Sequence, residues 1–179
     1  MDYHIIFEGG IDQQATQKLF LAFQSAKTAS ANNIVLFFSS LGGNIYEGFT
    51  LASIIQNSQI PIVIHATNHI DSIANVIYLS AKVRSSESYT KFYLHGASQN
   101  GNFDEKSMKD ALSAIRTNNS RIAHYISENS TLSLKKVQSM MRIGTTISAQ
   151  DALKYNITQQ IVHREIPATI PREEIIYIN

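Results

Sequence analysis

The sequence of 179 residues contains no cysteine, so neither a disulfide framework nor a thiolate site is possible. It has no excess of one charge, since 15 Lys and Arg face 14 Asp and Glu, and this balance without a basic run argues against a nucleic-acid partner. No apolar run approaches about 18 residues, so we expect no membrane-spanning segment. The N-terminus lacks a basic stretch followed by an apolar one, which makes a cytoplasmic protein the default expectation.

What the sequence does contain is typical of a globular protein. Hydrophobic residues make up 44% and charged residues 16% of the chain. The length is that of one domain, and we expect residues 1–179 to form a single one. The low share of charge mildly favours an oligomer with buried faces.

The first half of the chain alternates between strand-like and helix-like patterns. Strands are predicted at 3–7, 33–38 and 60–66, and helices after Asp12, at 46–58 and at 72–81. Such alternation indicates βαβ units and a mainly parallel sheet, with functional loops at the carboxyl ends of the strands. Two further short strands are expected near "KVRSS" and "KFYLH".

The second half is predominantly helical. Residues 103–129 form one long helical pattern, and a shorter helix is predicted from "SLKKVQSMM". "SAQDALKYN" opens with a capping pattern, Ser148 to Asp151, and stops at Asn156. The tail, 163–179, is predicted either to cover a face of an assembly or to be disordered. These patterns together predict an α/β fold with a projecting helix.

Ser72 follows a predicted strand and opens a predicted helix, and two interpretations compete for it. Ser is a common helix N-cap, because its oxygen accepts from the free N–H groups of the first turn. A serine in this place can also be a nucleophile, because the helix N-terminus favours developing negative charge. The G-x-S-x-G pattern itself is absent, since Ile70 and Ala74 stand where the glycines would be.

Two other stretches could serve the same chemistry. Gly42 and Gly43 follow a buried strand and could present backbone N–H groups to an oxyanion, although a plain turn explains them equally well. His95 ends "KFYLH" beside a loop, where a general base could reach a substrate. The alternative is an inert surface histidine, as the chain has six. We expect no metal, because His65 and His69 share no helix face and no carboxylate completes a site.

The order and spacing of these stretches resemble the Clp-type serine peptidases, within the wider crotonase-like superfamily. The resemblance covers about residues 3 to 162. It rests on six stretches, which are "IIFEGGID", "FFSSLGGNIYEG", "DSIANVIYLSAK", "KFYLHGAS", the long segment 103–129 and "TTISAQDALKYNITQQIV". It implies a ClpP/crotonase-like fold, Ser72 as nucleophile, His95 as base, and 103–129 as the handle helix by which stacked rings interlock.

The sequence also departs from the family at several places. Leu41 stands where Pro is usual, Asn156 stands where Gly is usual, and Asp71 precedes Ser72 where a small residue is usual. The most consequential departure is Gly144, which occupies the place of the family's catalytic aspartate. Removing that acid from an evolved triad costs about 3 × 10⁴ in kcat, or about 6 kcal/mol.

The function that the resemblance implies is peptide hydrolysis inside an oligomeric chamber, a heptameric ring or stacked rings, with no cofactor. Ser72 would attack, His95 would carry the proton, and the N–H groups of Gly43 and Ile73 would bind the oxyanion. The family's axial N-terminal segment is missing before the first strand, so we expect no stimulation by a standard Clp ATPase. Two alternatives are a catalytically silent Clp-like subunit, which Gly144 favours, and a crotonase-type acyl-CoA enzyme.

Overall fold

The computed structural model describes residues 1–171 and 174–178, and its elements alternate as the sequence predicts. In chain order they are β1 (Asp2–Gly9), α1 (Gln13–Thr28), β2 (Asn33–Ser40), α2 (Ile45–Gln56), β3 (Ile62–Asp71), α3 (Ala74–Ser80), β4 (Val83–Ser86), β5 (Lys91–Leu94), α4 (Glu105–Glu128), α5 (Leu134–Ile143), β6 (Thr145–Ser148), α6 (Ala149–Lys154), β7 (Gln160–Ile161) and β8 (Ile175–Ile178). None of the helices in the described part of the chain has the length and hydropathy needed to cross a bilayer.

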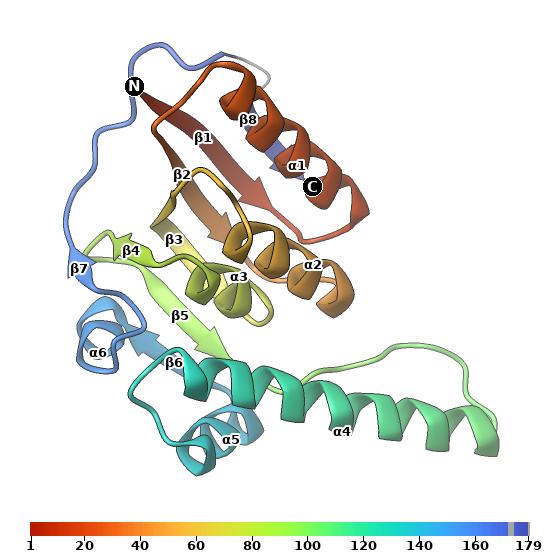
Figure 1. Ribbon diagram of the computed structural model, residues 1–179. Helices are drawn as coiled ribbons and strands as arrows, with labels where there is room; N and C mark the ends of the chain where they lie inside the picture. Colours follow the sequence, from red (N-terminus) through yellow and green to blue (C-terminus); the bar gives the residue numbers. More distant parts are fainter. Residues whose placement is uncertain (172–173, 179) are drawn as a thin grey trace.

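One sheet organises the molecule, with its strands in the order β6-β5-β3-β2-β1-β8. Strand β4 pairs with β3 and β7 beside this path. The pairings among these strands are parallel, except that β5 and β6 run antiparallel. Crossovers between successive parallel strands place α1, α2 and α3 side by side on one face (Figure 1). The predicted α/β fold of βαβ units is therefore confirmed.

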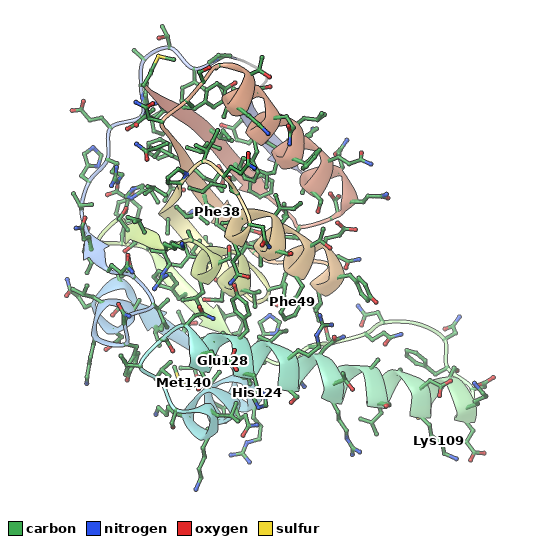
Figure 2. The ribbon with its side chains drawn as sticks, in the orientation of Figure 1. Phe38, Phe49, Lys109, His124, Glu128 and Met140 are labelled. Atoms are coloured by element: carbon green, nitrogen blue, oxygen red, sulfur yellow. The ribbon has the colours of Figure 1, made fainter. Side chains whose placement is uncertain are left out.

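Helix α4 projects from this body (Figure 1). It begins with a capping box, in which the N–H of Ser107 donates to Asp104 Oδ1 at 2.7 Å and the N–H of Asp104 donates to Ser107 Oγ at 2.9 Å. Figure 2 shows Lys109 near the free end of α4 and His124 and Glu128 near the body. The predicted projecting helix is confirmed.

Strand β3 is longer than the sequence predicts. The apolar pattern ends at residue 66, but the strand continues to Asp71 because its second half pairs with β5, with Ile70 opposite Phe92 and Asp71 opposite Tyr93. Partners about twenty residues away supply these backbone hydrogen bonds, which a local pattern cannot show. As a result, Ser72 directly follows a strand and does not begin the helix.

The C-terminal tail contributes a strand that the sequence did not predict. Strand β8 lies parallel to β1 at the sheet edge, with Ile6 opposite Ile175, and Ile176 is buried in the core. This ordered pairing rules out the alternative of disorder for residues 175–178, while 172–173 and 179 lie outside the described residues. The core itself lies between the sheet and helices α1 to α3, and every residue of β2 from Ile34 to Ser40 is buried.

Candidate active site

Ser72 lies in a strained turn between β3 and α3. Its φ of +57° is in the left-handed region, which residues other than glycine rarely adopt and which functional sites often hold. Its backbone N–H donates to the carbonyl of Tyr93 at 2.8 Å, and this bond fixes the turn to β5. The N-cap of α3 is Ile73, and no side chain caps the helix. The interpretation of Ser72 as a plain N-cap is therefore wrong.

Asn75 braces this turn from inside the core. Its side chain is buried, and its Nδ2 lies within hydrogen-bond distance of the carbonyls of Ile70, Ser72 and Tyr93, at 3.0, 3.1 and 3.0 Å. Two N–H groups are thus shared among three acceptors that come from β3, the turn and β5. Sequence analysis missed this residue, although an asparagine inside the apolar run "SIANVIYL" was a visible signal.

Gly42 and Gly43 form a loop that packs directly against the Ser72 turn. A Cβ on Gly42 would lie 2.7 Å from Ser72 Cβ, and a Cβ on Gly43 would lie 2.3 Å from the carbonyl oxygen of Ile11. Their φ values of +93° and +148° are also unfavourable for side chains. Both positions therefore require glycine for packing as well as for the turn, and Gly42 brings the loop into contact with the serine.

Two backbone N–H groups, one in this loop and one directly after Ser72, have no acceptor among the described residues. The N–H of Gly42 is used, since it donates to Ser40 Oγ at 3.1 Å. Among the described residues, none accepts a hydrogen bond from the N–H of Gly43 or Ile73. These are the two donors that the sequence predicted for an oxyanion, and the structure brings their chain segments together at Ser72.

His95 follows the last residue of β5, and the pairing of Asp71 with Tyr93 brings it to the same sheet edge as Ser72. Its Nδ1 lies 2.8 Å from the carbonyl oxygen of Gly96. A carbonyl only accepts, so Nδ1 carries the proton and Nε2 is left as the acceptor. Within residues 1–171 and 174–178, no hydrogen bond joins His95 to Ser72.

The Gly144 position adjoins this histidine through Tyr93. The Tyr93 ring stacks on the His95 ring, with centroids 4.8 Å apart and planes inclined by 26°. A Cβ built on Gly144 would lie 2.8 Å from the Tyr93 hydroxyl, and the φ of Gly144 is +71°. Gly144, which the resemblance aligns with the family's aspartate, is therefore bordered by Tyr93.

Asp71 directly precedes Ser72 and carries the ionisable group closest to it in sequence. Burial raises the pKa of its carboxyl, while the positive charges that His69 and His95 can carry lower it. Its Oδ2 lies 3.8 Å from His69 Nδ1, and its Oδ1 is buried without a partner among the described residues. Asp71 therefore attracts a protonated His95 but is not hydrogen-bonded to it.

A cavity of about 450 Å³ opens beside the residue that follows His95. Its lining consists of Gly96, Arg116, Asn119, Ser120, Gln138, Met141 and Arg142. A larger cavity, about 740 Å³, lies at the opposite ends of the strands, where β2, β3 and β4 begin. Of these two cavities we assign the smaller one to the candidate site, because it adjoins Gly96 next to His95.

No group of three or more His, Asp or Glu in the described part of the chain could hold a metal ion.

Comparisons with known proteins agree with this geometry at the level of fold and family. The sequence matches the family model described as Clp protease over residues 1–165. The fold is similar to that of a ClpP1 mutant from Listeria monocytogenes, with a TM-score of 0.80 and 20% sequence identity over 96% of this chain and 93% of that one. No curated protein sequence matches the chain. The chain belongs to the Clp protease family, as its resemblance predicted.

Proposed function

We propose that the protein is a serine peptidase in which Ser72 is the nucleophile and His95 the general base. Ser72 Oγ attacks the peptide carbonyl, and His95 Nε2 takes its proton and returns it to the leaving amine. The N–H groups of Gly43 and Ile73 bind the oxyanion, each contributing about 2.7–4 kcal/mol to the transition state by analogy with other oxyanion donors. Water then hydrolyses the acyl-enzyme.

The observation that carries this proposal is the conformation of Ser72. A serine with φ of +57°, a side chain that caps nothing and a turn braced by Asn75 is costly to maintain for packing alone. The same sharp strand-to-helix turn exposes the nucleophile of hydrolases with an elbow motif. Strain at this residue therefore supports a chemical role for its hydroxyl.

His95 supports the proposal through its tautomer. The carbonyl of Gly96 holds the proton on Nδ1, which is the role that the triad acid plays when it orients an imidazole. Nε2 is then free to accept from Ser72 once the two side chains approach. A backbone carbonyl is neutral, so it stabilises the imidazolium less than a carboxylate, and we expect slow turnover.

The test is labelling with a fluorophosphonate probe, with the modified residue located by mass spectrometry. We expect labelling of Ser72 in the wild type, none in Ser72→Ala, and weaker labelling in His95→Ala. Ser30→Ala is the matched control, because Ser30 also has a positive φ, +53°, but lies in the turn after α1. Labelling that persists in Ser72→Ala, or that is independent of His95, would refute the proposed mechanism.

A catalytically silent subunit is the second candidate, and two observations favour it. Gly144 provides no acid, and no hydrogen bond joins Ser72 to His95 within the described residues. If the assembled wild type does not label at all, this second function replaces the first.

We also propose that the chain assembles into a ring, heptameric and stacked in pairs, which encloses the site for peptides or unfolded protein. Clp family membership and the projecting α4 support this proposal. Met108 and Leu112, four residues apart on α4, are 58% and 46% exposed, and an apolar pair of this kind suits a helix–helix contact. Light scattering should therefore be used first to measure the molar mass of the assembly, and the labelling experiment is done on that species.

A further inference from the structure

The side chain of Tyr93 occupies the space that an acid at position 144 would need. A Cβ on Gly144 would come within 2.8 Å of the Tyr93 hydroxyl, closer than such contacts normally are, and within 3.5 Å of the Tyr93 Cζ. The conformation of Gly144 is left-handed as well. An aspartate at 144 would therefore require the Tyr93 side chain to shift from its present position.

Tyr93 also contacts the candidate base directly. Its ring stacks on the His95 ring at a centroid distance of 4.8 Å, and the two residues are two positions apart, with Tyr93 in β5 and His95 directly after that strand. A stacked ring restricts the rotation of the imidazole. The negative face of an aromatic ring also attracts a cation, so the stack favours the imidazolium that forms during catalysis.

We propose that Tyr93 is the positioning residue for His95 and takes over the orienting role of the family's missing acid, an inference that rests on the proposed function. Gly144 is then the residue that makes room for Tyr93. The loss of the acid and the presence of Tyr93 are two parts of one arrangement, in which a stacked ring and the Gly96 carbonyl together hold His95.

Other charges near His95 must be kept constant in any test. Asp71, on β3 opposite Tyr93, lies within electrostatic range of His95, and His69 adjoins Asp71. Strand β6 presents Thr146 opposite Tyr93, and α4 presents Asn119, which accepts from the N–H of Ala97 at 2.6 Å. Neither Thr146 nor Asn119 titrates. The groups to leave untouched are therefore Asp71 and His69, together with Arg116 of α4 and Arg142 of α5 in the cavity beside Gly96.

The experiment measures the rate of fluorophosphonate labelling of Ser72 across about pH 5 to 9 in the full-length protein. We expect Tyr93→Phe, which keeps the ring, to label within about twofold of wild type. Tyr93→Leu removes the ring, and we expect its labelling rate to fall about tenfold. The pH profile of labelling should change as well, since His95 loses its aromatic neighbour. Tyr89→Leu is the matched control, because Tyr89 is 65% exposed and lies outside the site.

A second part of the experiment introduces an aspartate at position 144. Gly144→Asp in the wild-type background should slow labelling, because the new side chain displaces Tyr93 from His95. Gly144→Asp in the Tyr93→Phe background should slow labelling less, because the obstructing hydroxyl is gone. Gly144→Asp combined with Tyr93→Leu should label faster than Tyr93→Leu alone. Aspartate tolerates the left-handed conformation better than most residues, which makes this rescue feasible.

The outcomes separate this inference from the proposed function. If Tyr93→Leu labels at the wild-type rate with an unchanged pH profile, or if Gly144→Asp has the same effect in all backgrounds, the role of Tyr93 is refuted while Ser72 and His95 stand. If Ser72 does not label in the wild type, the proposed function fails first. Should Tyr93→Leu not fold, the comparison of Gly144→Asp in the wild-type and Tyr93→Phe backgrounds still decides the question.

Discussion

Replacing Ser72 with glycine should make the protein more stable than the wild type. The φ of Ser72 is +57°, and the left-handed conformation costs a non-glycine residue about 1–2 kcal/mol. Glycine removes this cost but makes the unfolded chain freer, which offsets about 0.4–1 kcal/mol. The net expectation is a free energy of unfolding about 0.5–1 kcal/mol higher, or a Tm higher by about 1–4 °C.

Replacing Ser72 with alanine separates strain from capping. Alanine keeps the Cβ and therefore the strain, and the serine side chain that it removes caps nothing in α3. We therefore expect Ser72→Ala to match the wild type within about 0.5 kcal/mol. If Ser72 were an N-cap, alanine would cost about 1 kcal/mol and glycine a few tenths, so both variants would be less stable than the wild type.

The assay is urea unfolding followed by circular dichroism, at one fixed protein concentration because an assembly would make stability depend on it. Asn156→Gly is a useful comparison, since Asn156 also has a positive φ, +56°. Asparagine tolerates that conformation better than serine, so its gain should be smaller. A Ser72→Gly variant that is less stable than the wild type would contradict the strain argument and revive the capping one.

Two further predictions concern the surroundings of the site. Burial lowers the pKa of His65, although Glu87 opposes this effect. Between this lowered pKa and the ordinary value of 6.5 the unfolded state binds more protons, so the free energy of unfolding should fall as the pH drops below about 6.5. Urea midpoints at several pH values will show this loss, and His65→Gln should lack it. Gly48→Ala would place a Cβ 2.1 Å from Ile73 Cγ1 and should cost about 1–3 kcal/mol. Combined with Ile73→Ala, which removes that atom, it should cost less than the sum of the two single changes, and strict additivity in urea unfolding would disprove the contact.

Local signals in the sequence were sufficient for much of the fold. Asp12 accepts from the N–H of Ala15 at 2.7 Å and begins α1, and Ser148 accepts from the N–H of Asp151 at 3.1 Å and begins α6, as the capping patterns predict. Such caps involve residues only three positions apart. The apolar periods of the helices are equally local, which is why their types and approximate bounds could be predicted.

The features that the sequence did not predict depend on residues far apart in the chain. The last residues of β3, up to Asp71, are a strand because they pair with β5. Strand β8 likewise pairs with β1, at the opposite end of the sequence. At the site, the sequence shows that residue 144 is glycine, but only the folded chain shows that the Tyr93 hydroxyl borders that position. A one-dimensional pattern cannot show which distant side chain borders a given position.

Tyr93 connects the two halves of the candidate site through different atoms. Its carbonyl accepts from the N–H of Ser72 at 2.8 Å and from Asn75 Nδ2 at 3.0 Å, whereas its ring contacts His95 and borders Gly144. A change of the Tyr93 side chain therefore leaves the backbone bonds at Ser72 in place. Because the main chain of Tyr93 holds the Ser72 turn and its side chain contacts His95, a loss of labelling in Tyr93→Leu would be attributed to His95.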